Sequence, residues 1–220
     1  MPGPTARGTA DAITLVHPAV TVPGMTVSRP AVGERGQVIL DAAAEAFYEK
    51  GFHGVGVDEI GRRAGLSGPA LYRHFSGKDE ILATLLDQAM DELMTATEPV
   101  HGDPERDLDR ALRHHVTFAL EHRELVGLHH REARSLADPW STTFARRTGR
   151  YTRRWEELVS RSSPGAGPEV VATATQACLG MLFSVSAWPE RALQTADTAD
   201  VLMTLLTGGL RALAGAPAPS

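Results

Sequence analysis

The residues best suited to a defined chemistry form a run of basic side chains with no acid between them. Residues 60–78 contain no Asp or Glu. They carry four basic side chains: Arg62, Arg63, Arg73 and Lys78. The net charge of the whole chain is −5, so this positive charge is local. A cluster of cations is typical of a surface that binds nucleic-acid phosphates. A solvated helix face is the alternative interpretation of Arg62 and Arg63.

Two short helices are expected to position these cations. Residues 57–64 have the apolar spacing of the first helix, and Ser67 is suited to cap the second, which has Pro69 in its first turn. A turn that contains glycine joins them, and a longer helix over residues 35–50 precedes them and ends at Gly51. Two such helices packed against a third form a helix-turn-helix, which places its second helix in the major groove of DNA.

The start of the second helix permits close approach to base edges. Its small residues are Gly68, Pro69 and Ala70. Either Pro69 or Ala70 can make apolar contact with a thymine methyl group. Tyr72, His74 and Lys78 are placed to donate hydrogen bonds to phosphates beside the groove. Phe75 is assigned to the core of the small domain.

The remainder of the chain is also helical, so the predicted fold is all-α. A fourth helix carries apolar residues from Ile81 to Leu93, and later helices are expected at residues 104–123, 125–136, 139–162, 168–188 and 198–214. We divide the chain into a flexible arm at residues 1–32, a DNA-binding domain at residues 33–94 with the helix-turn-helix at residues 56–75, and a larger domain at residues 100–214. Met1 and Met25 are both candidate starts.

Composition argues against several other classes. Hydrophobic residues make up 42% of the chain and charged residues 22%, which is typical of a globular protein. The single cysteine, Cys178, excludes a disulfide framework, suits a reducing cytoplasm and is interpreted as a core residue. Residues 170–189 are uncharged and long enough to span a bilayer, but their Thr, Ser, Gln and small residues favour a buried helix of a soluble protein.

No catalytic or metal-binding motif stands out. The sequence has no P-loop, dinucleotide-binding turn, nucleophile elbow or metalloprotease box, so we expect no enzyme activity and no cofactor. The histidines that invite a metal interpretation are His114, His115, His122, His129 and His130. His115 and His122 are seven residues apart, whereas a helical zinc site favours a spacing of four, so no metal is expected. Some of these histidines are alternatively suited to hydrogen-bond a ligand.

Coordinated matches over about sixty residues add a family resemblance. The matching residues are Ile39, Leu40, Asp41, Ala42, Ala43, Phe47, Glu49, Lys50, Gly51, Phe52, Val57, Ile60, Ala64, Gly65, Leu71, Tyr72, His74, Phe75 and Lys78. With them, residues 34–93 resemble the DNA-binding domain of the TetR family of bacterial transcriptional regulators. The resemblance implies a homodimer, an operator with two-fold symmetry and a ligand-responsive C-terminal domain. It also implies DNA contacts at Pro69, Tyr72, His74 and Lys78.

Three positions depart from the pattern of that family. Gly56 stands where a hydroxyl side chain often touches a phosphate, so its contact must come from the backbone N–H. Asp58 would repel DNA and is excluded, and Gly68 replaces a residue that often has a long polar side chain, so base readout is expected to be sparse. The full set of predicted DNA contacts is Gly56, Arg63, Ser67, Gly68, Pro69, Ala70, Tyr72, Arg73, His74 and Lys78.

The resemblance also assigns roles to the C-terminal half. The last two helices, residues 168–188 and 198–214, would pair with those of a second copy in a four-helix bundle, and their small, uncharged residues independently favour a close-packed surface. Residues 104–162 would enclose an effector pocket. The candidates for its wall are Phe118, His122, Trp155 and Phe183, and core packing is an equal alternative for each. A mostly apolar lining would suit an apolar effector.

The expected function is that of a cytoplasmic, homodimeric repressor that a small molecule releases from a palindromic operator. Its expected partners are double-stranded operator DNA, a second copy of the chain and the effector, with no membrane partner. An activator of the same family is one alternative. A small-molecule-binding or assembly protein that retains the helix-turn-helix as a scaffold is another.

Overall fold

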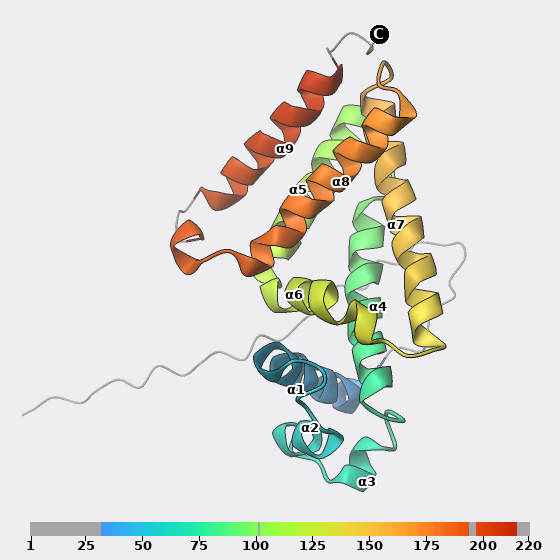
Figure 1. Ribbon diagram of the computed structural model, residues 1–220, viewed down its shortest axis with the longest axis vertical. Helices are drawn as coiled ribbons and strands as arrows, with labels where there is room; N and C mark the ends of the chain where they lie inside the picture. The colour runs from blue at the N-terminus through green and yellow to red at the C-terminus, as the bar shows by residue number, and fades with distance from the viewer. Residues whose placement is uncertain (1–31, 101, 194–196, 215–220) are drawn as a thin grey trace, which may run out of the picture. The chain divides into compact units, whose positions relative to one another are not determined.

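The computed structural model describes residues 32–100, 102–193 and 197–214, which belong to a compact unit that begins at Val32. Over these residues every regular element is a helix (Figure 1), which confirms the all-α fold class. The α-helices are α1 (Glu34–Lys50), α2 (Val57–Arg63), α3 (Gly68–Leu71), α4 (Lys78–Ala96), α5 (Pro104–Glu121), α6 (Arg123–Glu132), α7 (Trp140–Ser162), α8 (Pro168–Ser184) and α9 (Thr198–Ala214). The predicted arm at residues 1–32 lies outside the described residues except for Val32.

Helices α3, α6 and α8 each end four residues before their predicted ends at residues 75, 136 and 188. Helix α3 stops at Leu71, and the next residues form turns in which the N–H groups of His74 and Phe75 donate to the Leu71 carbonyl, at 2.9 and 3.1 Å. Helix α8 stops at Ser184 and continues as a 3₁₀ turn, η2 (Val185–Ala187). The next residue, Trp188, is extended with ψ of 142°. This is the conformation that the residue before a proline prefers.

The first three helices and the start of α4 enclose a common apolar core. Its fully buried side chains are Ile39, Leu40, Phe47, Ile60, Leu71, Ile81 and Leu82. Burial of each stabilises the fold by about 1.5–3 kcal/mol relative to exposure. Gly51 ends α1 with φ of 72°, a conformation that favours glycine, and its N–H donates to the Phe47 carbonyl at 2.9 Å. Phe52 then turns inward, with its ring centroid 5.3 Å from that of Phe47, so the loop after α1 is fixed on the core.

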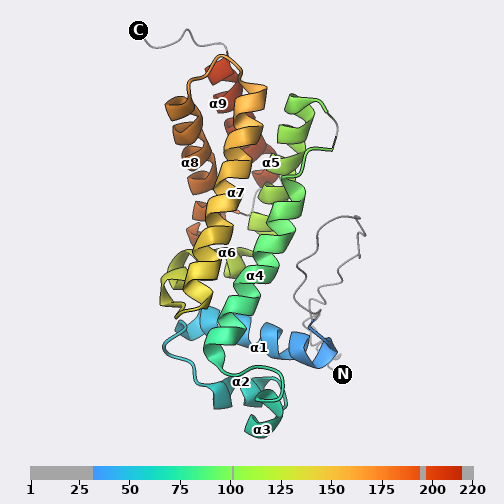
Figure 2. The same cartoon turned by 90° about the vertical axis from the view of Figure 1, so that its right-hand side faces the viewer.

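Helix α4 connects this N-terminal group with the C-terminal helices (Figure 2). It packs against α1, α5, α6 and α7, while α6 also contacts α1 directly. Helix α5 contacts α7, α8 and α9 in the C-terminal group. Asp103 caps α5 by accepting hydrogen bonds from the N–H groups of Glu105 and Arg106, at 3.0 and 3.4 Å. The functional surfaces are therefore held by a continuous set of packed helices.

One segment of the described chain, Pro168–Ala187, is long and apolar enough by composition to cross a membrane. Its mean hydropathy is 1.5, and core helices of soluble proteins meet the same criterion. Its inner face carries the buried residues Val171, Cys178 and Leu182, and the helix packs against α5 and α7. Burial raises the pKa of the Cys178 thiol, as expected of a core cysteine. The segment is thus weak evidence for a membrane span.

Candidate nucleic-acid interface and regulatory core

The residues predicted to contact DNA lie on α2, on α3, on the turns around them and, for Lys78, at the start of α4. Six of them are exposed: Gly56, Ser67, Pro69, Tyr72, Arg73 and His74. Four are partly buried: Arg63, Gly68, Ala70 and Lys78. Tyr72 is a large side chain with 57% of its surface exposed. The side chains of Arg73 and His74 have no hydrogen-bond or ion-pair partner within the described residues, so both are available to a phosphate. Ser67 precedes α3 as predicted, but its side chain makes no capping hydrogen bond.

Two glycines shape the turn between α2 and α3, one through its backbone conformation and one because the chain approaches it closely. Gly65 has φ of 66°, which favours glycine. Gly61 is buried, and a Cβ at this position would lie 3.2 Å from the Leu66 carbonyl oxygen. The N–H of Leu66 donates to the Gly61 carbonyl at 2.8 Å, so the chain folds back tightly on α2. Sequence reasoning identified Gly65 but missed Gly61, because a glycine inside a helical pattern gives no sign of what approaches it.

Arg63 is held by two carboxylates. Its Nη2 lies 2.6 Å from Glu49 and 3.1 Å from Glu59, which also pairs with Lys50 at 2.6 Å. These hydrogen bonds raise the pKa of Arg63 above its usual range and lower the pKa values of Glu49 and Glu59. Two carboxylates offset most of the positive charge that Arg63 would offer to DNA. Its contact with DNA stays a prediction, as do the other nine.

Lys78 fastens the loop between α1 and α2 to the start of α4. Its ammonium donates to the backbone carbonyls of Phe52 and Val55, both at 3.1 Å, and lies 4.5 Å from the centroid of the Phe52 ring. An ammonium has three N–H donors, so one remains for a phosphate. Carbonyl acceptors leave its charge intact. Lys78 is therefore placed to position the helix-turn-helix and to contact DNA.

The residues at the end of α6 also contact the loop between α1 and α2. Glu132 accepts the backbone N–H of Phe52 at 3.2 Å and the Ser135 hydroxyl at 3.1 Å. The Ser135 hydroxyl also lies 3.3 Å from Nε2 of His53. Arg131 is placed over the Tyr48 ring, 5.5 Å from its centroid. Sequence reasoning missed this joint, because its members are about 80 residues apart and no local pattern connects them.

The structure brings only two of the four predicted pocket residues around one centre. Trp155 and Phe183 surround His115, with ring centroids 5.7 and 5.8 Å from its own. Phe118 is buried and forms a ring pair with His122 at 4.9 Å. The effector-contacting role of all four stays a prediction.

His115 is the polar centre of the C-terminal core. Only 1% of it is exposed, its Nδ1 lies 2.6 Å from the Tyr151 hydroxyl, and its buried Nε2 has no hydrogen-bond partner in the described structure. His129 of α6 stacks on Phe183 with ring centroids 5.3 Å apart, and its buried Nδ1 is likewise unpartnered within that structure. Burial, with smaller contributions from neighbouring histidines, lowers the pKa of His115 to about 3 and that of His129 to about 4.

These pKa values keep both imidazoles uncharged at neutral pH. Tyr151 is also uncharged, because burial raises the pKa of its hydroxyl. The core thus offers neutral hydrogen-bonding groups among aromatic rings. No cluster of three or more His, Cys, Asp or Glu side chains with metal-ligand geometry occurs in the described part of the chain. Sequence reasoning placed Tyr151 and Trp155 on one helix face but did not connect Tyr151 with His115, which lies 36 residues away on another helix.

Comparison with known proteins identifies two matched regions. Residues 39–85 match the family described as bacterial regulatory proteins, tetR family. Residues 101–210 match the family described as tetracyclin repressor-like, C-terminal domain.

Two curated relatives are similar over part of the chain. The transcriptional activator FasR of Mycolicibacterium smegmatis is 46% identical over 61 residues, which are 28% of this chain and 27% of FasR. The transcriptional regulator EthR of Mycobacterium tuberculosis is 30% identical over 87 residues, which are 40% of each chain. The chain therefore spans between about a quarter and two fifths of the length of these relatives.

Solved structures are similar over most of the chain. PfmR from Thermus thermophilus, a TetR family transcriptional regulator, has a TM-score of 0.67 and 27% identity over 79% of this chain and 97% of its own. AibR, solved in complex with isovaleryl coenzyme A and operator DNA, has a TM-score of 0.68 and 21% identity over 78% of this chain and 97% of its own. At 21% identity the second likeness shows a common fold.

Proposed function

The chain belongs to the TetR family of bacterial transcriptional regulators, and we propose that it is a cytoplasmic, homodimeric repressor that a small molecule releases from a palindromic operator. The proposal that the protein binds DNA rests on the exposed side chains of Tyr72, Arg73 and His74 at the end of a helix-turn-helix. The match of residues 101–210 to a repressor-like domain favours repression. The domain boundaries at residues 33–94 and 100–214 agree with the two matched regions and remain part of the proposal.

The proposed dimer forms through the outer faces of α8 and α9. The uncharged exposed residues of these faces include Thr173, Gln176, Ala177, Gly180, Ser184, Val201, Thr204, Leu205, Gly208 and Gly209. The exposed charged residues of the two helices, Glu169, Asp200 and Arg211, lie in their first or last turns. Between them, Val201 and Leu205 are 54% and 55% exposed. An apolar, small-residue face of this kind is suited to a second copy related by a two-fold axis. Such symmetry would set the two recognition helices about 34–36 Å apart, as successive major grooves require.

The proposed effector site is the neutral core around His115, Trp155 and Phe183. The AibR structure, which holds both an acyl coenzyme A and operator DNA, supports a ligand-responsive role for this fold. Helix α6 supplies a route to the DNA-binding unit, because it carries His129 in the core and Glu132, one turn later, at the Phe52 amide. An effector that displaces Phe183 would move α6 and, through Glu132, the loop that Lys78 holds.

Replacement of Glu132 by Ala is expected to loosen that loop. The Phe52 N–H would lose its acceptor, which costs about 1–3 kcal/mol for a buried donor. We expect faster hydrogen exchange of the amides of residues 52–55 and an operator affinity several-fold lower, with the dimer unchanged. Hydrogen exchange read by mass spectrometry and fluorescence anisotropy measure these changes. Glu124→Ala, on the same helix and exposed, is the control. Equal exchange in both variants would remove Glu132 from the coupling route.

Binding to the DNA upstream of its own gene tests the proposed function. The protein is expected to bind this duplex more tightly than a scrambled one, and Tyr72→Ala combined with Arg73→Gln to weaken binding to both by at least tenfold. In transcription assays on the same DNA, a fall in transcript indicates repression and a rise indicates the activator alternative, which the FasR match favours. The neutralised Arg63 favours the scaffold alternative instead. Absence of binding to any genomic fragment would support that alternative.

A further inference from the structure

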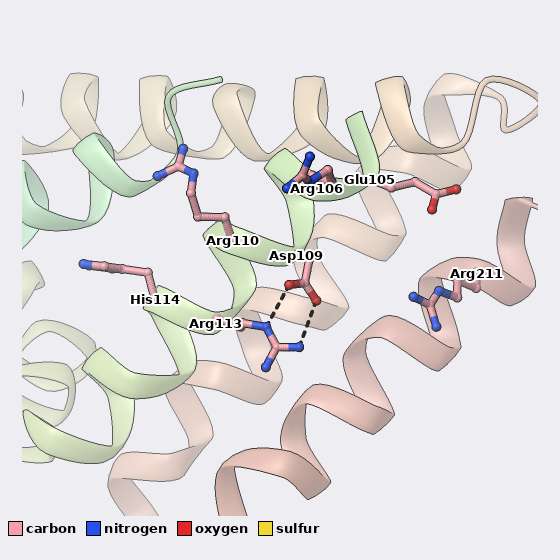
Figure 3. Close-up of a pocket in the computed structure, with 7 residues that line it drawn as sticks. All are labelled: Glu105, Arg106, Asp109, Arg110, Arg113, His114 and Arg211. Carbon is pink, nitrogen blue, oxygen red and sulfur yellow. Dashed lines mark hydrogen bonds and ion pairs between the residues drawn. The ribbon is translucent and has the colours of Figure 1, made fainter. Parts of the chain in front are cut away.

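A cleft of about 620 Å³ lies between α5 and α9. Six of its lining residues belong to α5, and Arg211 comes from α9 (Figure 3). The cleft is far from the helix-turn-helix, because α4 separates the two regions and its nineteen residues span roughly 28 Å at 1.5 Å per residue. DNA bound at the recognition helices therefore has no contact with it.

The lining carries an excess of positive charge. Its acidic members are Glu105 and Asp109, and its basic members are Arg106, Arg110, Arg113, His114 and Arg211. Arg113 uses Asp109 in a two-point pair, with distances of 2.7 and 3.3 Å. Glu105 is then the remaining carboxylate for three guanidinium groups. On a chain with a net charge of −5, this concentration is a local exception.

Several of these basic side chains have nitrogen atoms that make no hydrogen bond within the described structure. Arg110 donates to the backbone carbonyl of Glu98, a neutral acceptor, and its buried Nε has no partner in the described structure. His114 has a buried Nδ1 that is also unpartnered there, while its Nε2 lies 3.9 Å from Glu92. Arg106 and Arg211 make no ion pair with any described residue. Arg106 and Arg211 are exposed, so their guanidinium groups can exchange water for an anion without breaking an ion pair.

We propose that this cleft binds a small anion that carries phosphate groups. Guanidinium groups donate two parallel hydrogen bonds to phosphate oxygens, and the first turn of α5, where Arg106 lies, presents the positive end of the helix dipole. None of the lining side chains is apolar, so the site differs in chemistry from the aromatic core around His115. Because Arg211 is on α9 and the other cations are on α5, the anion would also tie these two helices together.

Titration with pyrophosphate and with ADP tests the site. In calorimetry at constant ionic strength, pyrophosphate is expected to bind saturably and to raise the melting temperature by roughly 5 °C at a hundredfold excess over its Kd. The variant with Arg106→Gln and Arg211→Gln is expected to bind at least tenfold more weakly. The control variant with Arg146→Gln and Arg153→Gln has the same net charge, removes two exposed arginines of α7 and should bind as wild type. Tighter binding of ADP than of pyrophosphate would identify a nucleotide, and equal binding would identify the phosphate groups alone.

Circular dichroism and operator binding without added anion keep this test independent. Both double variants should fold and bind operator DNA as the wild-type protein does, and the single variants Arg106→Gln and Arg211→Gln replace a double variant that fails to fold. No saturable binding, or equal losses in the two double variants, would overturn the proposal. So would equal stabilisation by pyrophosphate and by sodium chloride of matched ionic strength, which indicates screening alone. None of these results depends on whether the protein represses transcription.

Discussion

Replacement of Leu205 by Glu is expected to convert the dimer into monomers and to lower operator affinity at least a hundredfold. The Leu205 side chain is 55% exposed on the middle turns of α9, which carry no charged residue. In the proposed dimer it is covered by the second copy, so the variant would bury an unpaired carboxylate in each chain, which costs several kcal/mol. A monomer can occupy only one half-site at a time. Light scattering at micromolar concentration and an electrophoretic mobility assay measure the two effects.

A matched control separates assembly from a general effect of added charge. Val100→Glu places the same charge on another exposed apolar residue, which is 66% exposed and lies between α4 and α5. It should remain a dimer with unchanged operator affinity. A Leu205→Glu protein that stays dimeric would place the interface elsewhere.

A substitution at Gly180 provides a second test of the proposed dimer interface. A Cβ at Gly180 meets no atom within 4 Å in the single chain, so a larger side chain has space unless a second copy is present. Gly180→Leu is therefore expected to weaken the dimer by roughly 1–3 kcal/mol through overpacking while it leaves the fold of the single chain intact. The concentration dependence of dissociation in sedimentation experiments measures this change. An unchanged dissociation constant would show that Gly180 faces solvent in the assembly.

The sequence predicted the elements well because their signals are local. Gly51 after an amphipathic run and Asp103 before a proline mark helix boundaries that the structure has within one or two residues. The end of α3 was harder to predict, because Tyr72 has helix-compatible backbone angles and the chain leaves the helix only through turn hydrogen bonds to Leu71.

The candidate sites were predictable only in part, because they depend on contacts between distant residues. Basic side chains and small residues identified the DNA-binding surface. The capture of Arg63 by Glu49 depends on the angle between α1 and α2, which no spacing encodes. In the same way, His115 and Phe183 meet only because α5 and α8 pack together, and Glu132 reaches Phe52 only because α6 contacts α1.

Acid is expected to destabilise the protein through its buried histidines. His115 has a pKa of about 3 in the folded protein, against an ordinary value of 6.5, because burial penalises the charged imidazole. Below pH 6.5, His115 therefore binds a proton in the unfolded chain but not in the folded chain. The stabilisation is fully present above pH 6.5 and is lost as the pH falls toward 3. For His115 alone the loss amounts to about 2 kcal/mol between pH 6.5 and 5.

Comparison of variants isolates this contribution from that of the carboxylates. His115→Gln cannot titrate but keeps a hydrogen-bonding group for the Tyr151 hydroxyl. As the pH is lowered, its free energy of unfolding should therefore fall less steeply than that of the wild-type protein. The difference between the slopes should approach one proton between pH 6 and 5. His74→Gln removes an exposed histidine that contributes to the pKa of neither His115 nor His129, and it is the control. Urea denaturation at pH 7.5, 6.5, 5.5 and 5.0 gives the three curves. Parallel curves for wild type and His115→Gln would mean that His115 accepts its proton in the folded core, and the proposed effector site would then present a charge and not a neutral imidazole.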